Sequence, residues 1–141
     1  MEPDDAGTAE PGAPPNILIV DDSSMMRTMI KRVTSVAGLA IGTVFEAANG
    51  QEALAILERH AVHFLFTDIN MPVMTGTELL RAMQAREEWR HIVRIIISTD
   101  GSESRRHEAE DLNVKIYVEK PFRPEVMRDV LSNLTPVSGG R

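Results

Sequence analysis

Four apolar stretches of the sequence end in side chains that could carry out phosphoryl chemistry. They end in Asp21 and Asp22 after "ILIV", Asp68 after "HFLFT", Ser98 and Thr99 after "RIII", and Lys120 after "YVE". An apolar run of this length is typical of a buried strand, so each group is expected at a strand end. Carboxylates, a hydroxyl and an ammonium group together can bind and stabilise a transferring phosphoryl group.

Three carboxylates that lie close together repel one another and resist desolvation, so positive charge has to accompany them. Lys120 supplies one positive charge, and a divalent cation would supply two more. The chain has no cysteine, which excludes thiolate ligands and disulfides. With oxygen donors only, Mg²⁺ is the expected cation. One of the carboxylates could then be a nucleophile that forms an aspartyl phosphate.

Five strands that alternate with five helices would bring these groups together. The predicted strands are residues 16–20, 43–47, 63–68, 92–98 and 114–119, and the predicted helices are 23–38, 50–60, 75–86, 102–112 and 124–134. This alternation favours βαβ units, a parallel sheet and helices on both of its faces. Runs such as "ILIV" and "III" fit strands that are covered on both sides. The carboxyl ends of parallel strands meet at one edge, where ligands bind in open α/β sheets.

The helices carry start signals, stop signals and apolar faces. Ser23 or Ser24 can cap the first helix, which Gly38 should end, and Pro124 suits the first turn of the last helix. Helical spacing predicts these core-facing residues: Met26, Ile30, Val33, Ala37, Ala53, Leu54, Leu57, Leu79, Leu80, Met83, Val126, Val130, Leu131 and Leu134. The helix at 102–112 has a poor apolar stripe, little beyond Ala109 and Leu112, and should open at low cost. Trp89 is expected to be a local packing anchor.

Composition predicts one folded domain, at residues 16–135, between two tails. The net charge is −6, but residues 1–15 contain four acidic and no basic residues, so the rest of the chain carries only −2. We interpret residues 1–15 as a disordered acidic tail and 136–141 as a flexible end. No apolar run reaches the ~20 residues of a membrane span, and the start is not a secretory signal, so a cytoplasmic location is expected. No basic stripe suggests nucleic acid, and the four scattered histidines are expected at the solvated surface.

The segments "ILIVDDSSMMR", "TDINMP…TG", "IIIST" and "YVEKPF" together resemble the receiver domain of response regulators in two-component signalling. The resemblance covers residues 16 to about 135 and is nearest to stand-alone receivers of the chemotaxis type. It implies a flavodoxin-like, doubly wound sheet of five parallel strands in the order 2-1-3-4-5, with five helices.

The resemblance also implies a role for each candidate residue. Asp68 would be the phosphoacceptor, Ser98 the switch hydroxyl and Lys120 the lysine that contacts a phosphoryl oxygen. Tyr117 would be the aromatic residue that changes rotamer on activation. The Mg²⁺ ligands would be Asp21, Asp22, Asp68 and the backbone carbonyl of Asn70. The family's cis bond falls at Lys120–Pro121.

The sequence departs from the family pattern in two places, and neither touches the expected chemistry. Thr75 stands where the family has "MDG" more often, and Asn113 replaces a common Gly after the fourth helix, where Asn tolerates a left-handed conformation. Asn70 and Asp100 flank the site at variable positions, which implies an effect on the lifetime of the phosphate.

Simpler explanations remain open for single residues. Asp21 and Asp22 could only cap a helix, Lys120 could be an exposed lysine before a turn, and Tyr117 could be ordinary strand packing. Ser98 rather than Thr99 is assigned to the hydroxyl because its separation from Lys120 needs no gap against the family pattern.

The resemblance predicts a single-domain response regulator that receives a phosphoryl group from a histidine kinase or a phosphotransfer protein. No chain remains after Thr135 for an output domain, so we expect an unidentified protein target at the face of the fourth helix and fifth strand. Other hypotheses are an intermediate phosphate carrier in a relay, an Asp-nucleophile phosphatase, a flavodoxin-like cofactor binder and a phosphate-independent scaffold. The family catalyses only its own phosphorylation and dephosphorylation, so an enzyme in the usual sense is not expected.

Overall fold

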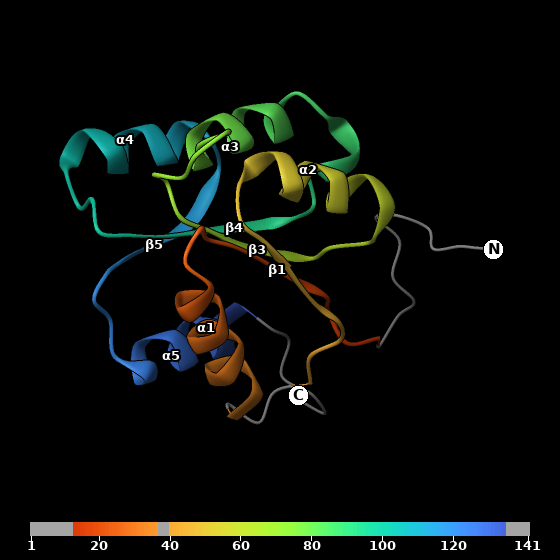
Figure 1. The fold of residues 1–141 in the computed structure, drawn as a ribbon, viewed down its shortest axis with the longest axis vertical. Coiled ribbons are helices and arrows are strands. Elements are labelled where there is room, and N and C mark those ends of the chain that lie inside the picture. The colour runs from red at the N-terminus through yellow and green to blue at the C-terminus, as the bar shows by residue number, and fades with distance from the viewer. Residues whose placement is uncertain (1–12, 37–39, 135–141) are drawn as a thin grey trace.

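A five-stranded parallel sheet forms the centre of the protein (Figure 1). The structure is a computed structural model that describes residues 13–36 and 40–134. The strand order is β2-β1-β3-β4-β5, as predicted. The strands are β1 (Ile17–Val20), β2 (Val44–Ala47), β3 (Phe64–Thr67), β4 (Val93–Ser98) and β5 (Val114–Glu119).

Five α-helices cover the two faces of this sheet. They are α1 (Ser24–Val36), α2 (Gly50–Arg59), α3 (Gly76–Gln84), α4 (Glu103–Asp111) and α5 (Pro124–Leu134). Figure 1 shows α2, α3 and α4 on one side of the sheet and α1 and α5 on the other. The doubly wound architecture that the alternation of elements predicted is therefore confirmed.

Alternate residues of each central strand feed two separate hydrophobic cores. Leu18 and Leu65 point into the core under α2, α3 and α4, whereas Ile17 and Phe66 point into the core under α1 and α5. All four residues of β1 and of β3 are buried, as are the last five of β4. The edge strands β2 and β5 are only partly buried, which fits their position at the rim of the sheet.

Most of the predicted local signals are found in the structure. The Ser23 hydroxyl accepts a hydrogen bond from the Met26 N–H at 3.1 Å, so Ser23 rather than Ser24 caps α1. Asn113 has φ 62°, the left-handed conformation expected after α4, and the Lys120–Pro121 bond is cis. Trp89 is buried, as expected of a packing anchor. The predicted core residue Ala37, the Gly38 stop signal, most of the acidic tail and the segment 135–141 lie outside the described residues, as does the side chain of Leu134.

Two expectations were wrong, and one short element was not predicted. Val126 is 43% exposed and Met127, one position further, is completely buried, because Met127 rather than Val126 lies on the helix face of Val130 and Leu131, which are buried as predicted. Residues Glu87–Trp89 form a short 3₁₀ helix, η1, that the sequence did not predict. His63 is half-buried rather than solvated, because it lies beside the start of β1 and accepts a hydrogen bond from the Asn16 N–H at 2.9 Å.

Helix α4 contributes little to either core, as predicted. Ala109 is its only buried residue, with Leu112 buried just beyond its end. Polar contacts hold its outer surface instead, such as Arg81–Glu108 at 2.7 Å and Arg106–Glu119 at 3.3 Å. No helix in the described part of the chain has the length and apolar content to cross a membrane.

Candidate phosphoacceptor and metal site

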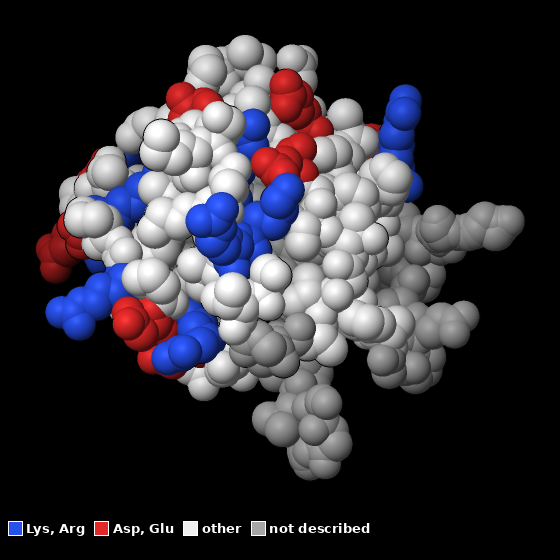
Figure 2. Space-filling model, turned by 60° about the horizontal axis from the view of Figure 1, so that its bottom comes forward, with Lys and Arg blue, Asp and Glu red and all other residues white. Residues whose placement is uncertain are grey.

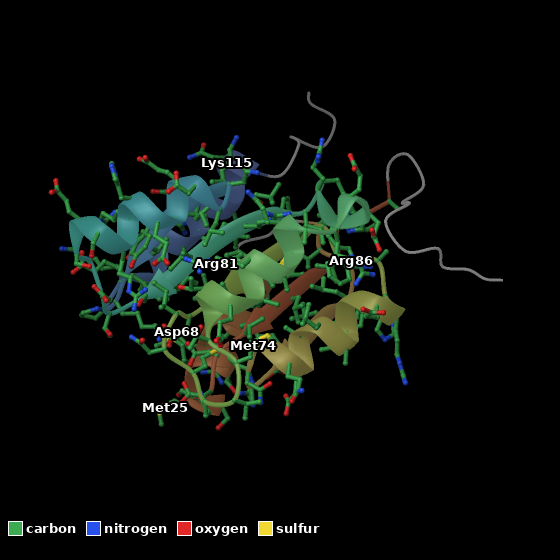
Figure 3. The ribbon with its side chains drawn as sticks, turned by 90° about the horizontal axis from the view of Figure 1, so that it is seen from above. Met25, Asp68, Met74, Arg81, Arg86 and Lys115 are labelled. Atoms are coloured by element: carbon green, nitrogen blue, oxygen red, sulfur yellow. The ribbon has the colours of Figure 1, made fainter. Side chains whose placement is uncertain are left out.

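The ends of β1 and β3 bring an acidic cluster together. These two strands are neighbours, and Val20 lies opposite Thr67, so the residues that follow them, Asp21 and Asp68, are adjacent. One carboxylate oxygen from each of Asp21, Asp22 and Asp68 lies within 4.8 Å of the others. The convergence that the parallel topology predicted is therefore present at the carboxyl edge, where Figure 3 labels Asp68 near the start of α3.

Lys120 neutralises part of this acidic cluster from the end of β5. Its Nζ lies 3.0 Å from Asp21 Oδ2 and 3.2 Å from Asp68 Oδ2. The three side chains that form this bridge are 3% to 12% exposed. An exposed lysine before a turn, the simpler explanation of Lys120, does not describe this geometry.

The backbone holds the other oxygens of the two buried carboxylates. Asp21 Oδ1 accepts a hydrogen bond from the Ser23 N–H at 2.9 Å, and Asp68 Oδ1 accepts one from the Ile69 N–H at 2.7 Å. Asp21 thus also stabilises the turn that leads into α1, so it both supports the start of this helix and belongs to the acidic cluster. Arg27 in α1, which the sequence did not single out, donates to the Asp21 carbonyl at 2.6 Å.

Burial and charge act in opposite directions on Asp68 and Lys120. Desolvation by burial raises the pKa of Asp68, although the Ile69 N–H and Lys120 lower it. Burial also disfavours the Lys120 cation, yet Asp21 and Asp68 together raise the pKa of Lys120 above its ordinary value. The charged carboxylate at position 68 is therefore an unfavourable species in this environment, and added positive charge would stabilise it.

The donor set fits a divalent cation that prefers oxygen ligands. Three carboxylates and one ammonium group leave two negative charges, and Asp22, unlike the other two acids, is exposed to incoming ions. Asn70, two residues after Asp68, is exposed at the same edge. The acidic cluster can thus hold a metal ion.

Gly76 fixes the loop that follows Asp68. A Cβ at position 76 would lie 1.9 Å from the carbonyl oxygen of Asp68, so no larger residue fits without moving that backbone. The Gly76 N–H donates to the Ile69 carbonyl at 2.8 Å, which closes the loop. The loop that follows Asp68 therefore brings the start of α3 into close contact with the backbone of the phosphoacceptor candidate.

Ser98 and Tyr117 lie on β4 and β5 and share one backbone neighbour. Ser98 is completely buried, whereas Thr99 is exposed, so only Ser98 faces the interior at the end of β4. The Ser98 hydroxyl accepts from the Asp100 N–H at 3.1 Å, and the Tyr117 hydroxyl donates to the Asp100 carbonyl. The Arg106 guanidinium lies 4.6 Å from the centre of the Tyr117 ring. The roles given to both residues stay predictions.

The fold and the acidic cluster define a class of protein: a doubly wound α/β domain with a lysine-bridged carboxylate site at its carboxyl edge. The family model described as the response regulator receiver domain matches residues 17–132. The chain belongs to this family, as the sequence resemblance predicted.

Curated relatives and solved structures agree with this assignment. The chain is 37% identical over 118 residues to the chemotaxis protein CheY of Pseudomonas aeruginosa, covering 84% of this chain and 94% of the relative. It is 38% identical over 116 residues to the chemotaxis protein CheY1 of Helicobacter pylori, covering 82% and 92%. The structure of the chemotaxis response regulator CheY4 of Vibrio cholerae matches with a TM-score of 0.77 and 30% identity, over 86% of this chain and 99% of that one. The chain is thus a receiver domain homologous to chemotaxis response regulators.

Proposed function

We propose that the protein is a stand-alone response regulator that accepts a phosphoryl group on Asp68 from a histidine kinase or a phosphotransfer protein. The observation that carries this proposal is the bridge from Lys120 to both Asp21 and Asp68 inside the acidic cluster. The chemotaxis relatives, of which the chain covers more than nine tenths, support a stand-alone receiver and a role in the control of motility. The cytoplasmic location belongs to the same proposal.

In the proposed reaction an Asp68 carboxylate oxygen attacks the phosphorus atom of the donor. The new O–P bond forms as the P–N bond to the donor histidine breaks, and the electron pair stays on the imidazole nitrogen. Lys120, already 3.2 Å from Asp68 Oδ2, is placed to shift from the carboxylate to a phosphoryl oxygen. Asp68 is held in position by the Ile69 N–H, which limits the geometries that it can adopt.

Mg²⁺ would be held by Asp21, Asp22, Asp68 and the backbone carbonyl of Asn70, and when bound it would neutralise charge on the phosphoryl oxygens. Asp22 is the exposed member of this set and Asp21 the deeply buried one. The residual charge of the acidic cluster, which Lys120 only partly offsets, supports a requirement for such an ion.

The proposed switch runs from Ser98 to the surface of α4 and β5. Ser98 would turn its hydroxyl toward the phosphoryl group, and the hydrogen bond that it now accepts from the Asp100 N–H would break. Because the Tyr117 hydroxyl donates to the carbonyl of the same Asp100, a shift of this residue would also free the tyrosine ring. The phosphate would thus bias two states of the face that binds the protein target.

The first test is to incubate the full chain with a small phosphodonor, with Mg²⁺ or with a chelator, and to measure its intact mass. We expect one labile phosphoryl adduct that requires Mg²⁺ and is absent from Asp68→Asn. Asp100→Asn, which lies at the edge of the site, serves as a matched carboxylate-to-amide control and should still be labelled. An adduct of equal yield on Asp68→Asn would overturn the assignment of the phosphoacceptor.

An Asp-nucleophile phosphatase is the main alternative from another class. Such enzymes carry a second acid two residues after the nucleophile, and this chain has Asn70 there. Multiple turnover of small phosphate esters would favour the phosphatase, whereas transfer from Asp68 to a second histidine protein would favour a relay carrier. We expect neither as the main activity.

A further inference from the structure

A pocket of about 420 Å³ opens at the amino edge of the sheet, away from the acidic cluster. Its lining comes from the end of α3, the η1 region, the start of β4 and the turn after α4: Met83, Gln84, Arg86, Arg90, Arg94 and Asn113. Figure 3 shows Asp68 near the start of α3 and Arg86 beyond the opposite end of this helix. We call this the arginine pocket, and the receiver chemistry uses none of its residues.

Arg94 is the unusual residue of the arginine pocket. It is only 3% exposed, and it interrupts the apolar run of β4 that precedes Ser98. Its guanidinium donates to Gln84 Oε1 at 2.8 Å, to the Trp89 carbonyl at 3.0 Å and to the Leu112 carbonyl at 3.3 Å. All these acceptors are uncharged, and the buried Arg94 Nε has no hydrogen-bond partner among the described residues.

The other two arginines differ in how firmly their charge is paired. Arg86 contacts both Glu58, at 3.1 Å, and Glu88, at 2.6 Å. Arg90 has a single contact with Glu87 at 3.3 Å, and both of these side chains are more than three-quarters exposed. An exposed pair of this kind is weak, so the Arg90 side chain can move to another anion. Within the described residues, Arg94 has no carboxylate within ion-pair distance.

A buried cation without a counter-ion is costly, and a bound anion would relieve that cost. Burial lowers the pKa of Arg94, which reflects the same unfavourable environment for its charge. A guanidinium nevertheless stays protonated in proteins, so the charge persists. Its planar arrangement of donors matches the two oxygens of a carboxylate or a phosphate.

We propose that the arginine pocket is a binding site for a small oxyanion, a carboxylate or a phosphate, held by Arg94 and Arg90. The side-chain amides of Gln84 and Asn113, which are hydrogen-bonded to each other at 3.3 Å, border the same space. Because these two residues lie at the ends of α3 and α4, the bound oxyanion ties the two helices together. The site does not depend on phosphorylation of Asp68.

Two sources could supply the same chemistry. One is a small anion from solution, and the other is an acidic side chain of residues 1–12 of the same chain, which contain Glu2, Asp4, Asp5 and Glu10 and no basic residue. The strands that start at this edge lie about 4.8 Å apart, and a segment of twelve residues can span up to about 40 Å. Both sources are within reach of the pocket.

The test is a titration of the full chain with inorganic phosphate and with malonate in a chelator, at constant ionic strength set with chloride. The readout is NMR, from the Arg94 Nε–H signal and the side-chain amide signals of Gln84 and Asn113. We expect saturable shifts of these signals. Arg90→Ala should weaken binding by about tenfold, the loss expected for one charge-assisted hydrogen bond.

Arg81→Ala is the matched control, because it also removes one arginine charge, but in α3 and outside the pocket, where Arg81 pairs with Glu108. It should leave binding unchanged. Arg94→Lys keeps the charge but loses the planar donors and should weaken binding to both anions; if this variant does not fold, Arg90→Ala still decides. Removal of residues 1–12 should tighten binding if the acidic segment fills the pocket and leave it unchanged if only solution anions do.

The proposal is overturned by shifts that do not saturate in either the full chain or the shortened one. Equal loss of binding in Arg90→Ala and Arg81→Ala would also overturn it, since general surface charge would then explain the shifts. Identical shifts of these NMR signals with chloride alone would overturn it for the same reason.

Discussion

Asp68 combines features that oppose each other, and the residues around it explain why it can be both buried and reactive. Its backbone is locked by the close approach of Gly76, and one carboxylate oxygen is held by the Ile69 N–H. Lys120 pairs with the other oxygen but is shared with Asp21. The result is a carboxylate in a fixed place whose charge is only partly compensated.

This partial compensation predicts that Asp68→Asn stabilises the protein when no divalent cation is present. Because the pKa of Asp68 is raised in the folded state, the folded state binds more protons than the unfolded one, and stability from this group is lost as pH rises through that pKa. The amide avoids this loss, so the variant should unfold at a higher urea concentration than wild type at about pH 7. The advantage should shrink as pH falls through the raised pKa of Asp68, because wild-type Asp68 then takes up a proton.

Two comparisons check this reasoning. Saturating Mg²⁺ should stabilise wild type more than Asp68→Asn, since the ion needs the carboxylate. Asp100→Asn should lower the stability of the protein at neutral pH rather than raise it, because hydrogen bonds from Ser102 lower the pKa of Asp100. A wild type that is more stable than Asp68→Asn in a chelator at neutral pH would contradict the account of Asp68.

Among the elements, α3 shows how a departure from the family pattern is accommodated. Thr75, which replaces the more usual residue of "MDG", is the N-cap of this helix. Its hydroxyl accepts from the Glu78 N–H at 3.1 Å, and Glu78 Oε1 accepts from the Thr75 N–H at 2.9 Å. This reciprocal capping box fixes the start of the helix directly beside the Asp68 backbone.

We therefore expect Thr75→Ala to lower the free energy of unfolding by about 1 kcal/mol, the usual cost of losing such a cap. Thr75→Ser keeps the hydroxyl and should stay close to wild type. Urea denaturation of the three proteins checks this. If Thr75→Ser loses as much stability as Thr75→Ala, the methyl group rather than the cap stabilises this turn.

Sequence patterns predicted the elements well wherever periodicity was strong. The uniform apolar runs of β1, β3 and β4 led to the correct sheet. The acids that follow β1 and β3, and the lysine that follows β5, led to the acidic cluster. In α5 only the first core position was misassigned: Val126 and Met127 are both apolar, and packing in the core under α1 and α5 selects Met127.

Arg94 and the half-buried His63 are the polar residues whose surroundings the sequence patterns did not predict. Arg94 could have been noticed as a charge inside an apolar strand, but its carbonyl partners come from η1 and from the end of α4. His63 is buried by its neighbours at the start of β1, far away in the sequence. Both depend on contacts across the sheet edge, which local periodicity does not encode.

In the whole molecule, the two edges of the sheet carry different chemistry. The carboxyl edge gathers Asp21, Asp22, Asp68 and Lys120, whereas the amino edge holds His63 and the arginine pocket. Figure 2 shows basic and acidic side chains interspersed on the face that it presents, without one dominant sign. The acidic cluster and the arginine pocket therefore lie at opposite edges of the sheet.

His63 predicts how the stability of the whole domain depends on pH. Desolvation by burial and the nearby His91 lower the pKa of His63, and its Nδ1 accepts the Asn16 N–H, so the neutral ring is the folded form. The unfolded state binds a proton near about pH 6.5, so stability is complete above that pH and falls as pH decreases toward the folded pKa.

His63→Asn retains an acceptor for Asn16 and removes this titration. Between about pH 7.5 and about pH 5.5, wild type should lose more stability than the variant, as measured by urea denaturation. His107→Asn, at a side chain that is 87% exposed, should follow wild type. Parallel pH profiles for wild type and His63→Asn would show that His63 does not contribute to the pH dependence.

The single tryptophan has a practical consequence for spectroscopy. Trp89 is buried in η1 with the Arg86 guanidinium 4.1 Å from its ring, and the residue beside the phosphoacceptor candidate is Ile69 rather than an aromatic. Intrinsic fluorescence should therefore report global unfolding and binding at the arginine pocket. It should change little when Mg²⁺ or a phosphoryl group binds at Asp68. A dye or a tryptophan introduced at position 69 would be needed to time phosphorylation optically.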